Sequence, residues 1–171
     1  MSATSPLPPP SRLLLGPGPS MVHPRVLQAM ATPLVGHLDP AFLEIMEDTK
    51  RQLRGLFRTT NELTLPISGT GSAGMETCLV NLLEPGDEAV VCVNGVFGTR
   101  MADIVERCGA TLVKVEAPWG QVIDPADVAA ALHTAARPKL VAIVHAETST
   151  GAWQPLEEIS RLTHEIGRAH V

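Results

Sequence analysis

The amino-acid sequence predicts an α/β fold in which a parallel-rich sheet carries helices on both of its faces. Two segments, 88–94 and 140–145, are almost wholly apolar, which is typical of strands that are covered on both sides. Segments with apolar residues at helical spacing separate the strand-like segments, so strand and helix alternate at least four times along the chain. Parallel strands need such crossover connections, and the alternation therefore favours a parallel sheet.

Composition limits the classes of function. With 171 residues, the chain can bury one ordinary core, either as one domain or as part of a larger one. A net charge of -5 without any cluster of Lys and Arg argues against a nucleic-acid partner, and no run of about 18 apolar residues is present to span a membrane. Three cysteines, Cys78, Cys92 and Cys108, lie far apart in apolar patterns. We therefore expect core thiols, a cytoplasmic protein and no metal site.

The N-terminal part of the chain predicts an arm followed by two helices. Residues 1–12 are rich in serine and proline and predict a flexible arm. The Gly-Pro-Gly-Pro run at 16–19 excludes a helix or a central strand and predicts an ordered extended segment. A short helix is predicted over 23–30. The Asp39-Pro40 pair supplies the N-cap and first turn of a longer helix that ends at about Arg58.

The remaining elements alternate between strand and helix. Residues 65–83 predict a strand, a tight turn and a helix, and Glu-Pro-Gly-Asp at 84–87 ends that helix. The next predicted strands are 88–94, 111–115 and 140–145. A helix with apolar residues at helical spacing follows each of these strands, and the last of the three helices is predicted to end near His170. The apolar residues are Met101, Ile104, Val105 and Cys108 in the first helix, Val128, Ala129 and Leu132 in the second, and Leu156, Ile159, Leu162 and Ile166 in the third.

Polar turns follow three of these strands, at 68–72, 94–99 and 145–151. Because the carboxyl ends of parallel strands meet at one edge of a sheet, we expect the three turns to lie at that edge. Ligands of open α/β sheets bind there. The sequence therefore predicts the functional site at this edge.

The first of these turns, Ser-Gly-Thr-Gly-Ser at 68–72, has the chemistry of a phosphate site. Its glycines, Gly69 and Gly71, permit unusual backbone angles and a close approach to a ligand. Free N–H groups at the start of the helix, the helix dipole and the three hydroxyl groups suit an anion. The alternative is a plain structural turn, because short strand-to-helix turns need Gly and Ser in any case. The spacing matches neither the P-loop nor the dinucleotide fingerprint.

Four further features of the other turns are open to two interpretations each. Phe97 lies between two glycines in a turn, so its ring either stacks on a flat ligand or packs into the core. His145 follows a strand, just before Glu147 begins the turn, and is either a general acid/base or a satisfied histidine at a strand end. The hydroxyl groups of 148–150 either donate to a ligand or cap the following helix. His37 either approaches a ligand or faces solvent in a loop.

Five motifs, taken together and in order, resemble class V aminotransferases, most closely the alanine–glyoxylate and serine–glyoxylate aminotransferase group. They are Leu15-Gly-Pro-Gly-Pro-Ser20, Ser68-Gly-Thr-Gly-Ser72 with Glu76, Leu83-Glu-Pro-Gly-Asp87, Asn94-Gly-Val-Phe-Gly-Thr-Arg100 and His145-Ala-Glu-Thr-Ser-Thr-Gly151. The likeness runs in register from about Leu13 to the last helix. It implies the large domain of a fold-type I pyridoxal-phosphate (PLP) enzyme, of which 13–171 would be the N-terminal part, incomplete at its C-terminus.

The resemblance also implies residue roles. Thr70, Gly71 and Ser72 would hold the phosphate of PLP, and Phe97 would stack on its pyridine ring, where some relatives carry Trp. Thr148 would hydrogen-bond near the phenolic oxygen of the cofactor.

The arm and the reaction follow from the same resemblance. Gly16, Pro17 and Gly18 would approach the substrate carboxylate and the dimer partner. The implied activity is transamination from alanine or serine to glyoxylate, in a homodimer, with PLP as the electron sink. A related enzyme of the same fold, such as a cysteine desulfurase or a phosphoserine aminotransferase, is an alternative that the 147–151 turn and the 16–19 arm disfavour.

The residues that carry out the catalytic steps are expected beyond Val171. None of the three lysines, Lys50, Lys114 and Lys139, follows the strand-to-turn pattern of a Schiff-base lysine. We therefore expect this chain to be an inactive front portion of the enzyme. Adapter DNA used in sequencing can encode the closing residues 166–171, and we expect the last few residues not to be native. One alternative is a catalytically dead truncated domain that binds phosphate or PLP weakly or pairs with a full-length subunit. Another is a nucleotide-binding domain, which would lack its third glycine and the acidic ribose partner.

Overall fold

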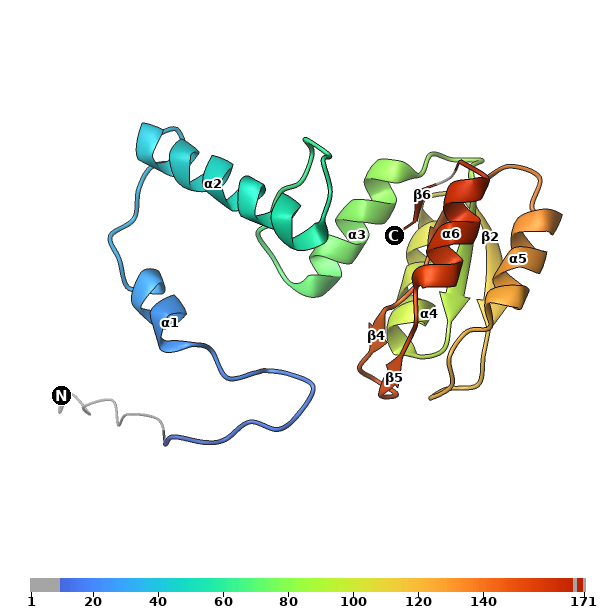
Figure 1. Cartoon of the computed structure of the whole chain (residues 1–171), viewed down its shortest axis with the longest axis horizontal. Helices are drawn as coiled ribbons and strands as arrows, with labels where there is room; N and C mark the ends of the chain where they lie inside the picture. The colour runs from blue at the N-terminus through green and yellow to red at the C-terminus, as the bar shows by residue number, and fades with distance from the viewer. Residues whose placement is uncertain (1–9, 168, 171) are drawn as a thin grey trace, which may run out of the picture. The chain divides into compact units, whose positions relative to one another are not determined.

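The computed structural model describes residues 10–167, 169 and 170, and the chain divides into two compact units, Met1–Leu65 and Pro66–Val171 (Figure 1). The predicted flexible arm at 1–12 lies mostly outside the described residues. Its last three residues, 10–12, are exposed and belong to no helix or strand. No helix in the described part of the chain is long and apolar enough to cross a membrane.

The first unit contains the two predicted helices, α1 (Pro24–Met30) and α2 (Pro40–Phe57). Asp39 caps α2 as predicted, because its Oδ1 accepts a hydrogen bond from the N–H of Ala41 at 2.8 Å. A left-handed Arg58 (φ 51°) ends the helix. Neither helix contains a fully buried residue.

The second unit is built on a four-stranded sheet in the order β2-β1-β3-β6, and every pair of neighbours is parallel. The strands are β1 (Glu88–Val93), β2 (Thr111–Glu116), β3 (Pro138–Ala142) and β6 (Ala169–His170). Their crossovers contain α4 (Val96–Arg107), α5 (Pro125–Thr134) and α6 (Glu157–Glu165), and α3 (Gly71–Leu82) precedes β1. A short antiparallel hairpin, β4 (Ala146–Glu147) with β5 (Ala152–Trp153), follows β3. The predicted parallel α/β fold is confirmed.

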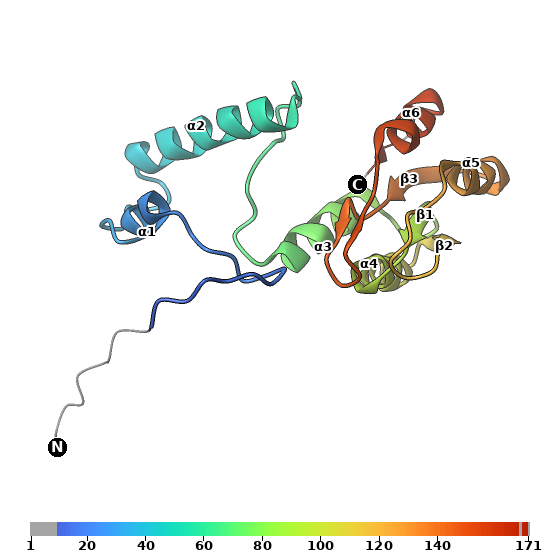
Figure 2. The ribbon, with the colours of Figure 1, turned by 60° about the horizontal axis from the view of Figure 1, so that its bottom comes forward.

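Alternate side chains of β1 enter two separate hydrophobic cores, which places helices on both faces of the sheet (Figure 2). Ala89, Val91 and Val93 pack with α3 and α4, whereas Val90 and Cys92 pack with α5 and α6. This is the period of two that a strand imposes on its side chains. The near-continuous apolar sequence of β1 therefore reflects burial on both sides.

Three boundaries differ from the predictions. The strand predicted at the start of 65–83 is wrong, because this segment has no hydrogen-bonded neighbour in the sheet and Pro66 lacks an N–H to donate. The strand predicted over 140–145 ends at Ala142, and 143–145 lead into the hairpin. The last helix ends at Glu165 rather than near His170, where β6 pairs with β3.

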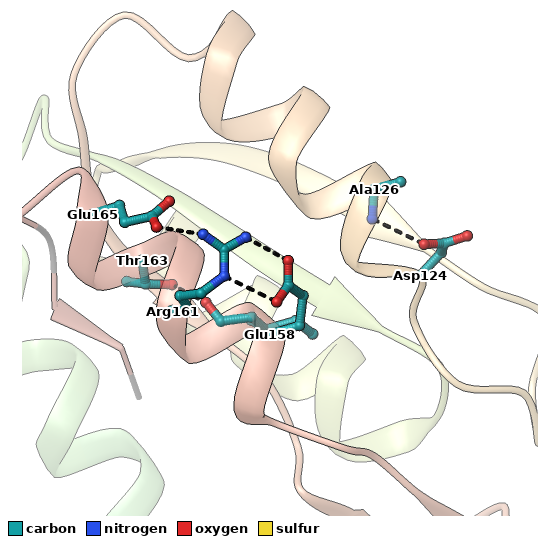
Figure 3. A network of polar contacts seen from close by, with 7 residues as sticks. Asp124, Ala126, Glu158, Arg161, Thr163 and Glu165 are labelled. Carbon is teal, nitrogen blue, oxygen red and sulfur yellow. Dashed lines mark hydrogen bonds and ion pairs between the residues drawn. The ribbon is translucent and has the colours of Figure 1, made fainter.

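The outer face of α6 carries a network of charged side chains (Figure 3). Arg161 pairs with Glu158 and Glu165 on the same helix, and its hydrogen bond to Glu158 lowers the pKa of that carboxyl group. Exposed pairs of this kind contribute little to stability. The helix is held instead by buried residues on its opposite side, such as Ile159.

The three cysteines differ in accessibility, so the prediction that all of them are core thiols is wrong for Cys78, which is exposed on α3. Burial of Cys92 in β1 raises the pKa of its thiol to about 12. Because the thiolate is the reactive form, we expect iodoacetamide at about pH 8 to modify Cys78 and to spare Cys92 in the folded chain. Peptide mass spectrometry measures both sites, and urea should make Cys92 reactive. Equal labelling of the two thiols in native buffer would contradict this expectation.

Candidate functional site

The N-terminus of α3 presents hydrogen-bond donors. Thr70 is the N-cap, and its Oγ1 accepts from the N–H of Ala73 at 3.3 Å while its carbonyl oxygen accepts from the N–H of Gly74 at 3.1 Å. Among the described residues, no acceptor faces the N–H groups of Gly71 and Ser72. These two groups lie at the positive end of the helix dipole, which suits an anion.

The predicted reason for the two glycines at this turn is wrong in one respect. Neither Gly69 nor Gly71 adopts a positive φ. A Cβ on Gly69 would lie 3.0 Å from the Cβ of Ala73, whereas a Cβ on Gly71 would meet no heavy atom within 4 Å. The helix therefore begins at Gly71 without unusual backbone angles, and the backbone there remains open to close approach.

Phe97 lies in the first turn of α4 rather than in the turn predicted from its flanking glycines. Its side chain is half-buried. One helical turn further on, the guanidinium carbon of Arg100 lies 5.2 Å from the centre of the Phe97 ring, within the range of a cation–π interaction. The same guanidinium group donates a hydrogen bond to Ser72 Oγ. The structure therefore brings the start of α3 and the Phe97 ring together through Arg100.

The N-terminus of α4 is capped by the β4–β5 hairpin. Glu147 is 1% exposed, and its Oε2 accepts from the N–H groups of Phe97 at 3.0 Å and Gly98 at 3.2 Å. Ser149 Oγ accepts from the N–H of Val96 at 3.0 Å and donates to Glu147 Oε1 at 2.6 Å. Glu147 is thus a satisfied polar group. Ser149 caps α4, which precedes it, and the prediction that it caps the following helix is wrong.

The other candidate side chains are placed as follows. His145 Nδ1 lies 2.9 Å from the carbonyl oxygen of Gln154, and its ring meets Trp153 edge-on at 5.8 Å, which confirms the interpretation as a satisfied histidine. Thr148 is exposed in the turn between β4 and β5. His37 and the 16–18 arm belong to the first unit and are exposed there. No group of three or more His, Cys, Asp or Glu suited to a metal ion occurs among the described residues.

Sequence reasoning missed Arg100 and the helix-capping role of Glu147. The first had a usable signal, because Arg100 follows Phe97 by one helical turn and such residues lie on the same face. That signal could be used only if α4 was known to begin before Phe97. The capping role of Glu147 had no sequence signal, because the contact joins residues that are far apart in the sequence.

Together these features define a class of parallel α/β domain in which a helix N-terminus, an aromatic ring and an arginine meet at one edge of the sheet. The particular family follows from comparison. The model of the aminotransferase class-V family matches residues 12–171, and the chain belongs to this family.

Two curated relatives share more than two fifths of their aligned residues with this chain. The (S)-ureidoglycine–glyoxylate transaminase of Bacillus subtilis is 45% identical over 150 residues, which cover 88% of this chain and 36% of the relative. The alanine–glyoxylate aminotransferase of Mus musculus is 43% identical over 163 residues, which cover 94% of this chain and 39% of the relative. The chain therefore spans well under half the length of these relatives.

Solved structures agree with the family assignment. The crystal structure of an alanine–glyoxylate aminotransferase from Nostoc sp. matches with a TM-score of 0.90 and 49% identity, over 98% of this chain and 44% of that one. The ureidoglycine–glyoxylate aminotransferase from Bacillus subtilis matches with a TM-score of 0.91 and 42% identity, over 97% of this chain and 43% of that one. The fold is that of the large domain of fold-type I PLP enzymes, of which this chain contains a part.

Proposed function

We propose that this chain is the N-terminal part of a PLP-dependent transaminase that passes an amino group from alanine or serine to glyoxylate. Family membership supports the reaction class, and both relatives described above carry glyoxylate in their names, with different amino donors. The observation that carries the proposal is the single guanidinium group of Arg100, which contacts both Ser72 and Phe97. A phosphate site and a ring-stacking residue would have to be neighbours for one cofactor to touch both.

The donor set at this edge fits the phosphate of PLP. Free N–H groups at the start of α3 and the Ser72 hydroxyl group can donate to phosphate oxygens, and the helix dipole favours a negative charge. The guanidinium group of Arg100 adds a positive charge beside Ser72, and no carboxylate of the described chain forms an ion pair with it. Much of the charge of a phosphate would therefore be offset by groups on this chain.

The resemblance to class V aminotransferases supplies the roles of the residues. Thr70, Gly71 and Ser72 would hold the phosphate, and Phe97 would cover one face of the pyridine ring. Thr148, exposed in the β4–β5 turn, would donate a hydrogen bond to the phenolic oxygen. When bound, PLP supplies the electron sink that transamination requires. Gly16, Pro17 and Gly18 would approach the substrate carboxylate in a homodimer of the whole protein.

The lysine that binds PLP covalently would lie outside this chain. Lys50, Lys114 and Lys139 each form an ion pair with a carboxylate, at 2.7 Å to Glu47, 2.9 Å to Glu116 and 2.6 Å to Asp87. None of these three carboxylate partners belongs to the candidate site. We therefore expect the 171-residue chain to bind PLP without turning over alanine and glyoxylate.

Titration of the chain with PLP, followed by absorbance, tests the proposal. We expect saturable binding that Phe97→Ala weakens by about threefold to tenfold, since an aromatic pair is worth about 0.5–1.5 kcal/mol beyond the area it buries. Phe57→Ala, at a ring that is 69% exposed in the first unit, is the matched control and should leave the affinity unchanged. Absence of binding, or equal effects of the two variants, would contradict the proposal.

A further inference from the structure

One buried acidic side chain has no part in the roles proposed above. Glu147 is 1% exposed, and no Lys, Arg or His of the described chain forms an ion pair with it. Its carboxylate accepts four hydrogen bonds instead, from the N–H groups of Phe97, Gly98 and Ser149 and from the Ser149 hydroxyl group. A buried carboxylate is costly unless its oxygens are satisfied, so the surrounding backbone is arranged around it.

The four donors come from two segments that are distant in the sequence. Oε2 binds the first turn of α4 through Phe97 and Gly98, at 3.0 Å and 3.2 Å. Oε1 binds Ser149, whose N–H lies at 3.3 Å and whose hydroxyl oxygen lies at 2.6 Å. Thr148 is the residue between Glu147 and Ser149, so the same carboxylate holds the turn that carries it. One side chain therefore binds both the first turn of α4, where Phe97 lies, and the turn that carries Thr148.

The close approach of the two segments depends on glycine. A Cβ on Gly95 would collide with the Glu147 side chain and would lie 2.7 Å from Ser149 Oγ. The position of the Glu147 carboxylate is also electrostatically favourable, because a carboxylate at a helix N-terminus interacts with the helix dipole and accepts charge-assisted hydrogen bonds. The arrangement is thus tight, and a small change at Glu147 should move the first turn of α4.

We infer that Glu147 is a positioning residue, which holds the Phe97 ring and the Thr148 hydroxyl group at the separation that one PLP molecule requires, without touching the cofactor. The inference rests on the proposed function. A purely structural cap would contribute to the stability of the fold and would leave the PLP affinity of the folded protein unchanged. A positioning residue must change that affinity, and part of the change must be made through Phe97.

Two variants of Glu147 distinguish the effect of the charge of the side chain from the effect of its length. Glu147→Gln keeps the size of the side chain and replaces one accepting oxygen with an NH₂ group, which cannot accept. Glu147→Asp keeps the charge and shortens the side chain by one methylene group. Glu158→Gln, at an exposed carboxylate of α6 that pairs with Arg161, is the matched control. Ser149→Ala, which leaves the carboxylate in place, is a milder second variant for use where a Glu147 variant does not fold.

Three measurements are made on the full chain below its melting temperature. Amide hydrogen exchange of the peptide that contains 95–98 needs no cofactor, and we expect Glu147→Gln to speed it. PLP titration should show affinity weakened about tenfold or more by either Glu147 variant and about threefold by Ser149→Ala, with a smaller induced circular dichroism in the PLP band. In a Phe97→Ala background, Glu147→Gln should weaken PLP binding by less than it does in the unsubstituted chain, because part of its effect is made through the same ring.

The outcomes are distinct. Unchanged exchange at 95–98 in Glu147→Gln overturns the contact itself. PLP affinity in Glu147→Gln within twofold of that in Glu158→Gln, or fully additive effects with Phe97→Ala, overturns the positioning role while the proposed function stands. Failure of the unsubstituted chain to bind PLP overturns the proposed function, and the positioning role with it.

Discussion

Replacement of Gly98 by alanine is expected to destabilise the second unit by about 1–2 kcal/mol, although alanine is the better helix former. Gly98 lies in α4, where the change to alanine would by itself add about 0.5–1 kcal/mol of stability. A Cβ at this position would lie 2.8 Å from the carbonyl oxygen of Cys92 and 2.9 Å from the Cα of Val93. Both are backbone atoms of the central strand, so α4 would have to move away from the sheet. Overpacking of this kind costs about 1–3 kcal/mol and sometimes more, which exceeds the gain in helix propensity.

Urea unfolding followed by far-ultraviolet circular dichroism measures this effect. Gly74→Ala is the matched control, because Gly74 lies inside α3 and a Cβ there would meet no heavy atom within 4 Å. We expect that variant to be about 0.5–1 kcal/mol more stable than the unsubstituted chain. If both substitutions stabilised the protein, the close approach of α4 to β1 would be disproved. Because Gly98 also adjoins Phe97, Gly98→Ala should weaken PLP binding as well.

Truncation of Leu140 to alanine is the second change with a large expected effect. Leu140 lies in β3 between β1 and β6, and its side chain is completely buried in the core that α3 and α4 cover. Removal of a buried leucine side chain leaves a cavity and costs about 2–5 kcal/mol. The free energy of unfolding of a native domain is only about 5–15 kcal/mol in total. We therefore expect a large fraction of the stability of this unit to be lost.

The denaturation midpoint in urea, compared with that of Leu82→Ala, tests the expectation. Leu82 is the last residue of α3 and is 40% exposed, so its truncation should cost less than about 1 kcal/mol. Equal costs for the two leucines would show that the Leu140 side chain is not buried as the structure has it. The m-value should stay the same in both variants, because neither changes the area exposed on unfolding by much.

Much of the fold could be predicted because its signals are local. The apolar run of β1, the Asp39-Pro40 helix start and the alternation of elements each depend on neighbouring residues only. The strand predicted at the start of 65–83 shows where this reasoning fails. An apolar segment becomes a strand only when another strand pairs with it, and no local pattern reports the presence of that partner.

The candidate site divides in the same way. The Ser-Gly-Thr-Gly-Ser turn before α3 was found from its composition, and the structure places its Ser72 beside Arg100. Phe97 was predicted to lie in a turn because two glycines flank it. Those glycines have another purpose, since Gly95 admits the Glu147 side chain and Gly98 admits the backbone of β1. The sequence shows that these residues are glycines, but only the packing of the folded chain shows why a side chain is excluded there.

The sequence by itself determined that this chain is a parallel α/β domain of the class V aminotransferase family with a polar edge, because hydrophobic periodicity and short motifs depend on nearest neighbours along the chain. The tertiary structure alone decided where α4 begins, which groups cap it and how Arg100 joins Ser72 to Phe97. Those contacts link segments that are far apart in the sequence. They form only when the sheet brings the ends of its strands to one edge, which is a property of the folded chain and of no single segment.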